Sequence, residues 1–223
     1  MDVGKSFTFP FEDKDWLVKI LIGGVFSLLS AILVGAPFVM GYILEVIRRV
    51  IRRDPQLLPE WDNLGEKFVQ GLIMLVIVMI WLIPVWIFTC IQTVAIVPLS
   101  EQGGSDGLIT AVSLCFSCLN FLWGLVVAAV TPALYTRYAM TGQFSSAFQF
   151  GEIWQFTSKN IVNIIIAVLV GAVAGLIGSL GVILCIVGVF LTMFWAQLVS
   201  AHLYGQVYAL AEQPPAVAPI ETI

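Results

Sequence analysis

The side chains that could carry chemistry are few, and they lie among apolar residues. His202 is the only histidine and occurs in QLVSAHLYGQVY. A histidine in a membrane helix can ligate the metal of a haem or chlorophyll, or it can form a hydrogen bond to a neighbouring helix. The chain has no second histidine to complete an axial pair. We therefore predict no cofactor of its own, and we keep His202 as a candidate ligand for a pigment that a partner carries.

Cys115 and Cys118 form a C-x-x-C pair in CFSC, a spacing that in soluble proteins suggests metal or redox chemistry. No second pair and no histidine lies nearby in the sequence. The other two cysteines, Cys90 and Cys185, also lie inside apolar runs, where thiols behave as small hydrophobic groups. The pattern favours helix packing and indicates no disulfide framework and no metal site.

Glu45 stands in an apolar segment just before the arginine-rich stretch RRVIRRDPQLLPEW. Arg48 and Arg49 follow it at i+3 and i+4, the spacing of a same-face ion pair on a helix. A carboxylate in this position is costly unless it is paired, or unless it moves protons or ions. We favour the pair. The arginines are Arg48, Arg49, Arg52 and Arg53, and we interpret them as a signal of membrane orientation rather than as a nucleic-acid site.

A set of polar side chains in the third apolar run could serve transport. Ser113, Ser117 and Asn120 recur at i, i+4 and i+7, which places them on one helix face. Such a face can line a polar path, or it can form hydrogen bonds between helices. No acidic residue lies deep in the second to last apolar runs, so the pattern gives little support to ion-coupled transport.

An enzyme is not expected. The residues provide no Ser-His-Asp set, no pair of carboxylates in a cleft and no phosphate-binding glycine loop. The polar connectors are also too short to hold an active site.

Composition places these residues in a membrane. Of the 223 residues 60% are hydrophobic and 11% are charged, whereas soluble domains carry about 25% charged residues. Such a chain cannot cover a folded surface with polar groups. We predict an all-α, polytopic transmembrane helical bundle, with a cytoplasmic N-terminal segment (1–16), one membrane domain (17–211) and a flexible C-terminal tail (212–223).

Four apolar runs must form the membrane segments, because one span needs about 20 residues. The second and third runs each predict one helix, the second kinked at Pro84. The last run predicts two helices, broken near Gly178–Gly181. The first run is interrupted at Gly35–Pro37 and predicts either one span or a short hairpin. In order, the runs are Leu17–Ile47, Phe68–Pro98, Leu108–Leu134 and Ile161–Leu210.

Positive charge favours the hairpin, since cytoplasmic connections are enriched in Lys and Arg. All ten cations occur in the N-terminal segment, between residues 48 and 67, or between residues 137 and 159. A hairpin turning at Gly35–Pro37 puts all ten on one side of the membrane, whereas a single span splits them seven to three. We therefore expect about six membrane segments with both termini in the cytoplasm. Five spans remain the alternative.

The two polar connectors predict short helices that lie at the membrane surface. In the first, Pro59 suits the start of a helix whose apolar face carries Trp61. In the second, Ser145 or Ser146 can cap a helix. Its expected aromatic face suits the headgroup region and consists of Phe144, Phe148, Ile153 and Trp154.

Two stretches carry a family resemblance: GYILEVIRRVIRRDPQLLPEWDNLGEKFVQG and RYAMTGQFSSAFQFGEIW. They resemble the prokaryotic membrane family catalogued as domain of unknown function 4013, over about residues 16–210. The resemblance is most specific in LPEWDNLGEKFVQG and GQFSSAFQFGEI. It implies a multi-helix inner-membrane protein of bacteria or archaea, and it brings no catalytic residues.

These observations lead to a functional expectation. We expect a non-enzymatic subunit, accessory to a larger membrane protein complex, with the lipid bilayer and other membrane subunits as its partners. The alternative is a small permease or channel that forms a homo-oligomer around Ser113, Ser117 and Asn120. A third reading is a lipid-interacting protein that acts through its basic connector.

Overall fold

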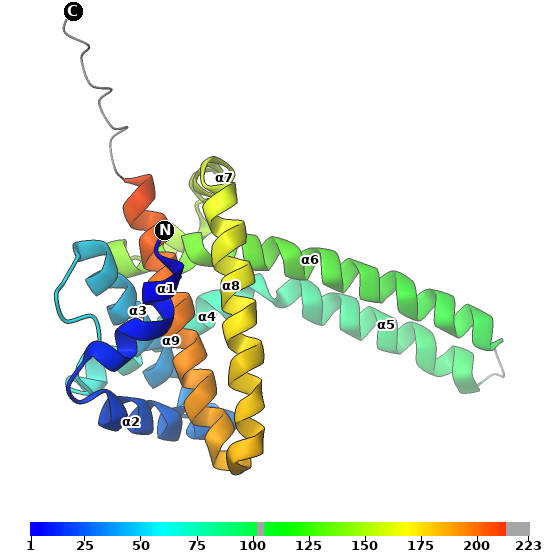
Figure 1. Ribbon diagram of the computed structural model, residues 1–223. Coiled ribbons are helices and arrows are strands. Elements are labelled where there is room, and N and C mark those ends of the chain that lie inside the picture. Colours follow the sequence, from blue (N-terminus) through cyan, green and yellow to red (C-terminus); the bar gives the residue numbers. More distant parts are fainter. Residues whose placement is uncertain (102–104, 213–223) are drawn as a thin grey trace, which may run out of the picture.

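The computed structural model describes residues 1–101 and 105–212, without the side chains of residues 184–187 (Figure 1). The described residues form helices and no strand, which confirms the predicted all-α class. The predicted tail beyond Glu212 and the side chain of Cys185 lie outside this description. Four helical stretches are long and apolar enough to cross a membrane: Leu64–Trp81, Ile83–Glu101, Asp106–Thr141 and Ile161–Ile183.

The first apolar run forms two helices, as the charge distribution predicted. Helix α2 (Trp16–Leu29) continues as the short 3-10 helix η2 (Ser30–Ile32). The chain turns at Leu33, whose φ is 65°, and α3 (Ala36–Arg52) follows. With 14 and 17 residues, α2 and α3 are each shorter than the length of about 20 residues that a span needs. The break at Gly35–Pro37 is confirmed, while the count of about six membrane segments stays a prediction.

The N-terminal segment is folded as well. It forms α1 (Val3–Thr8) and the 3-10 helix η1 (Phe9–Glu12). Together with Trp16–Ile32 it would pass as one apolar span, but the two parts are bent by 102°. This bent pair is the only way to obtain a fifth candidate span in the described residues.

The second apolar run differs from the prediction of one kinked helix. It forms α4 (Leu64–Trp81) and α5 (Ile83–Glu101), separated at Leu82. Pro84 lies in the first turn of α5, where its missing N–H costs no hydrogen bond. The two helices have different neighbours, because α4 packs against α3 while α5 packs against α6.

Helix α6 (Asp106–Thr141) has 36 residues, so it is about 54 Å long at 1.5 Å per residue. Its last part packs against α3 and α9. Its first part runs beside α5, and Figure 1 shows this pair projecting away from the other helices. No residue of α5 is buried, and the first buried residue of α6 is Val130. We call residues 83–101 and 106–129 the arm.

The chain then forms η3 (Phe144–Phe148), α7 (Phe150–Lys159) and a helical hairpin. The hairpin consists of α8 (Ile161–Ser179), the 3-10 helix η4 (Leu180–Leu184) and α9 (Cys185–Ala211). Its turn confirms the break predicted near residues 178–181. Helix α9 packs against α8, α3 and α2. We call α2, α3, α4, α8, α9 and residues 130–141 the bundle.

Helix α3 lies at the centre of the bundle, with Tyr42, Leu44, Val46 and Ile47 fully buried. Two glycines let α3 and α4 approach closely. A Cβ atom on Gly71 would lie 1.7 Å from the Pro37 carbonyl oxygen, and one on Gly41 would lie 2.0 Å from the Lys67 carbonyl oxygen. Backbone contact of this kind is how small residues join membrane helices.

Candidate functional site

The connector between α3 and α4, residues 53–63, is not the predicted surface helix. Arg53 ends α3 in the left-handed conformation, and α4 begins at Leu64 rather than at Pro59. Side chains and backbone from the bundle hold the connector in place. The Tyr42 hydroxyl donates to the Pro59 carbonyl at 2.9 Å, and the Trp61 indole N–H donates to the Lys19 carbonyl at 2.9 Å. Because these tertiary bonds fix it, the connector follows an extended path across α3.

Trp61 is partly buried between helices instead of anchoring the outer surface. Its ring stacks on Tyr42 at 4.3 Å and on Phe26 at 4.9 Å, and Phe194 lies 6.0 Å away, all measured between ring centroids. These rings come from α2, α3 and α9. Trp61 therefore joins the connector to the bundle core.

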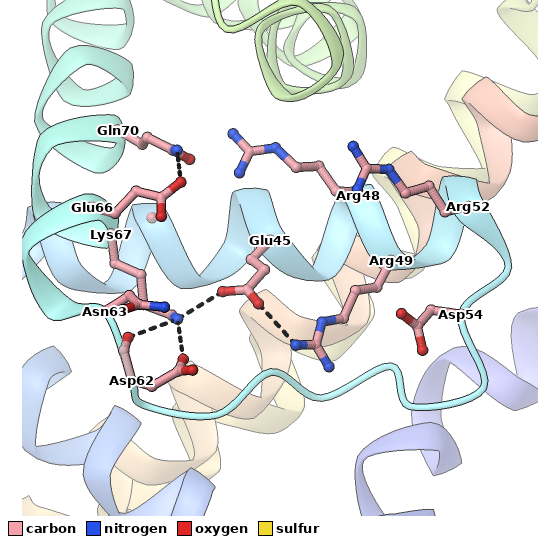
Figure 2. A pocket seen from close by; sticks show the side chains of 11 residues that line it. Glu45, Arg48, Arg49, Arg52, Asp54, Asp62, Asn63, Glu66, Lys67 and Gln70 are labelled. Atoms are coloured by element: carbon pink, nitrogen blue, oxygen red, sulfur yellow. Dashed lines mark hydrogen bonds and ion pairs between the residues drawn. The ribbon is translucent and has the colours of Figure 1, made fainter.

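An ion cluster joins α3, the connector and α4 (Figure 2). The Lys67 ammonium lies 2.7 Å from the Glu45 carboxylate and 3.1 Å from the Asp62 carboxylate, and the Arg49 guanidinium lies 2.9 Å from Glu45. The Glu45–Arg49 pair was predicted; the Lys67 contact was not. The hydrogen bond from Lys67 lowers the pKa of the Asp62 carboxyl.

A second cluster lies beside the first. The Lys19 ammonium, whose side chain is 3% exposed, lies 2.8 Å from the Asp13 carboxylate and 2.6 Å from the Glu60 carboxylate. Burial is the largest single influence on the pKa of the Asp13 carboxyl and raises it, but the hydrogen bonds from Lys19 and the Asp15 backbone and the charge of Lys19 together lower the pKa. The Leu58 carbonyl accepts from Lys19 at 3.3 Å and from Arg49 at 3.4 Å, so it connects the two clusters.

The remaining arginines of α3 point elsewhere. Arg48 does not pair with Glu45, although the spacing allowed it. Its Nε donates to the Ala139 carbonyl at 2.7 Å, in the last turn of α6, where carbonyls lack partners within the helix. Figure 2 shows Arg48 and Arg52 on the side of α3 opposite the connector.

These groups surround a hollow of about 330 Å³, which we call the polar hollow. Its lining contains four cationic and four anionic side chains. They are Arg48, Arg49, Arg52, Lys67, Glu45, Asp54, Asp62 and Glu66, together with Gly41, Asn63 and Gln70.

A second hollow, of about 480 Å³, brings further cation-bearing segments together. Arg53 lines it with Lys5 from α1 and with His202 and Gln206 from the end of α9. Arg48 is bonded to the end of α6, as described above. Four segments thus lie together at one end of the bundle. They are the N-terminal segment, the first connector and the ends of α6 and α9. This clustering is what the hairpin prediction requires.

His202 is buried and forms contacts between segments. Its Nδ1 lies 2.8 Å from the Ser6 hydroxyl and 2.9 Å from the Gln206 amide nitrogen. Its ring stacks on Phe9 at 4.6 Å between centroids. These contacts tie α1 and η1 to α9, which is the structural alternative to pigment ligation. Ligation of a pigment by His202 stays a prediction.

The predicted polar seam lies in the arm and does not form a continuous path in the described residues. The Ser113 hydroxyl donates to the Ile109 carbonyl of its own helix at 2.9 Å, and Ser117 is exposed. The Asn120 Oδ1 atom is buried without a hydrogen-bond partner among the described residues. Cys115 and Cys118 are both exposed on the arm. A seam would need a further chain to close it.

In the second connector the predicted aromatic face is only partly correct. Trp154 on α7 is 68% exposed, as an anchor at the membrane surface must be, whereas its neighbour Ile153 is 1% exposed. Adjacent residues of a helix point about 100° apart, so the two cannot share a face. Neither Ser145 nor Ser146 caps α7, since its N-cap residue is Gln149.

Residues 24–187 match the family described as "Protein of unknown function (DUF4013)". The chain belongs to the DUF4013 family. This confirms the resemblance, although the match is shorter than the expected 16–210 at both ends. The DUF4013 region contains the arm, the polar hollow and Trp154, and it excludes His202. No curated protein and no solved structure matches the chain.

Proposed function

We propose that this DUF4013 protein is a non-enzymatic accessory subunit that docks to another integral membrane protein through its arm. The observation that supports this is the composition of the arm's outer surface. Among large apolar side chains such as Phe121 and Leu122, the arm exposes small and polar residues, including Cys115, Ser117 and Gly124. Membrane helices that pack against protein use small and polar side chains, because these allow close approach and hydrogen bonds between helices.

Helix α8 provides the contrast within the same molecule. Its exposed residues are almost all large and aliphatic, for example Val162, Leu169 and Leu176 at 67%, 60% and 68% exposed. Such a surface suits lipid chains. The arm helices and α8 are all long and apolar enough to cross a membrane. The difference between their exposed residues supports a protein partner for the arm and lipid for α8.

The proposal includes an orientation. We place the protein in the inner membrane of a bacterium or archaeon, with both termini and the cation-rich end of the bundle in the cytoplasm, because cytoplasmic connections collect Lys and Arg. Reporter fusions at the N-terminus, the C-terminus and the arm tip near Ser105 test this. Cytoplasmic signals from both termini and an external signal from the tip are expected. An external signal at either terminus would refute the orientation.

The docking itself is tested by Gly124→Leu. A Cβ atom at Gly124 meets no atom within 4 Å, so the substitution fits the isolated chain. The leucine side chain would obstruct a helix packed on the arm. The amount of partner protein that co-purifies in mild detergent should therefore fall by about tenfold or more, because overpacking costs about 1–3 kcal/mol. The matched control is Ala172→Leu on the exposed face of α8, which should leave recovery unchanged. Equal recovery from both variants contradicts the proposal.

The permease alternative predicts a different outcome of the same experiment. There the arms of several copies would pack together and enclose Ser113, Ser117 and Asn120. Gly124→Leu would then convert a homo-oligomer into single chains, and no other protein would be lost. The mass of the purified particle in mild detergent distinguishes these cases.

A further inference from the structure

Two arginines of the polar hollow have no anionic partner in the part of the chain that the structure describes. Arg48 is bonded only to the Ala139 carbonyl, and Arg52 is exposed and makes no hydrogen bond or ion pair there. They are four residues apart on α3, where like charges face one another and repel. Figure 2 shows both guanidinium groups on one side of that helix.

A single carboxylate is left over on the same side. Glu66, in the first turn of α4, accepts a hydrogen bond from the Gln70 amide at 2.7 Å and pairs with no cation in residues 1–101 and 105–212. The carboxylates of Glu45 and Asp62 are already engaged by Lys67, as described above. Asp54 lies beyond the end of α3 and accepts from the Gln56 backbone N–H at 2.9 Å.

Once the internal ion pairs are closed, two cationic and two anionic groups remain in the hollow. Asp54 lies on the connector side of α3 (Figure 2), so the side with Arg48 and Arg52 offers two cationic groups and one anionic group, Glu66. The position of the hollow suits a lipid headgroup. Glu66 and Gln70 stand in the first turns of α4, which is long and apolar enough to cross a membrane, so the hollow lies where that apolar segment begins. Polar headgroups occupy this level of a bilayer.

We propose that the polar hollow binds an aminophosphate headgroup. Arg48 and Arg52 hold the phosphate, because the planar guanidinium fork matches phosphate oxygens. Glu66 receives the ammonium group, and the Gln70 hydrogen bond positions its carboxylate. An anion alone would meet the repulsion of Glu66, so the charge pattern favours a zwitterion. The chemical class is phosphoethanolamine, carried by phosphatidylethanolamine in the bilayer or free in solution.

The test uses the full-length protein, purified and stripped of lipid in mild detergent. Native mass spectrometry measures bound phosphatidylethanolamine against phosphatidylglycerol with identical acyl chains. The wild type should retain phosphatidylethanolamine about tenfold better. Arg52→Gln should lower its retention about tenfold, and Glu66→Gln should remove the preference for the amine. Arg53→Gln is the matched control, since Arg53 lines the other hollow, and it should change nothing.

Arg52→Gln is preferred to a change at Arg48, which also bonds to α6. Equal or better retention of phosphatidylglycerol by the wild type would overturn the proposal, as would unchanged retention in Arg52→Gln. Adding free phosphoethanolamine or inorganic phosphate then identifies the source. Displacement of the lipid by millimolar phosphoethanolamine supports a soluble ligand of the same chemistry, and resistance to it supports the lipid. Displacement by inorganic phosphate at the same concentration would overturn the role of Glu66.

Discussion

Most glycines of the bundle occupy an environment opposite to that of the glycines in the arm. In the bundle, Gly41 and Gly71 lie where two helix backbones touch, so a Cβ atom at either position has no room. In the arm, Gly107 and Gly124 have no atom within 4 Å of the position of a Cβ. The bundle has thus used most of its glycines to join its own helices, with Gly65 and Gly175 as exceptions whose Cβ positions are open. The glycines of the arm remain available to a helix from elsewhere.

Buried polar side chains of the bundle and the arm also differ in their partners. At the cation-rich end of the bundle, Lys19 and Lys67 are buried, and each has two carboxylates within ion-pair distance. In the arm, the side-chain amide oxygen Oδ1 of Asn120 has no partner among the described residues. A buried polar atom without a hydrogen bond costs free energy. Two atoms of the bundle, the Ser27 hydroxyl and the Trp195 indole nitrogen, are buried without a partner among the described residues as well. The difference between bundle and arm therefore lies in the ion-paired lysines and in the glycine contacts.

The largest expected effect is on stability, and it comes from a substitution that forces α3 and α4 apart in the bundle. Gly71→Leu would put a side chain against the Pro37 carbonyl, and overpacking should cost about 3 kcal/mol or more. We expect loss of a monodisperse peak in size-exclusion chromatography and a large fall in Tm. The matched change Gly124→Leu in the arm should leave both unchanged in the purified protein. Equal destabilisation by the two substitutions would contradict the comparison.

The next effect concerns the ion cluster. Lys67→Met removes the cation that Glu45 and Asp62 share, and the side chain of Glu45 is 25% exposed. Leaving a partly buried carboxylate with one partner fewer should cost about 1–3 kcal/mol. The free energy of unfolding in detergent measures this. Lys14→Met, at an exposed lysine, is the control and should have no effect; a similar loss in both variants would contradict a specific role for the cluster.

A smaller effect should follow pH. The pKa values of Asp13 and Asp62 are lower in the folded protein, so their ionised forms stabilise it. This stabilisation is complete above the unfolded value of about 4 and is lost as the pH falls through the folded values. Tm should therefore decline below about pH 4, and Asp13→Asn should make the decline shallower. An identical profile in that variant would show that Asp13 does not contribute.

The sequence predicted those features that depend on neighbours along the chain. The turn near Gly35, the helix break near Gly178 and the Glu45–Arg49 pair follow from local spacing, and all three are present. Lys67 was missed as a partner of Glu45, because helix α4 must fold against α3 before the two meet. The helix predicted from Pro59 failed for a similar reason, since tertiary hydrogen bonds hold that segment extended.

One signal in the sequence could have revealed more. Lys19 stands inside an apolar run, and a charge in that position requires a partner. A paired Lys19 predicts a nearby carboxylate, and the connector supplies one in Glu60. The arm could not be foreseen in the same way. Its exposure depends on α4 and α5 parting at Leu82, and the sequence there predicts a kink as readily as a separation.

The central claim is that the outer surface of the arm contacts protein whereas that of α8 contacts lipid. A photo-crosslinking amino acid at Phe121, 66% exposed on the arm, is compared in native membranes with one at Leu169, 60% exposed on α8. We predict a discrete adduct with one other membrane protein from position 121, which Gly124→Leu abolishes, and only lipid adducts from position 169. Lipid adducts alone from both positions, or the same protein adduct from both, would contradict the claim.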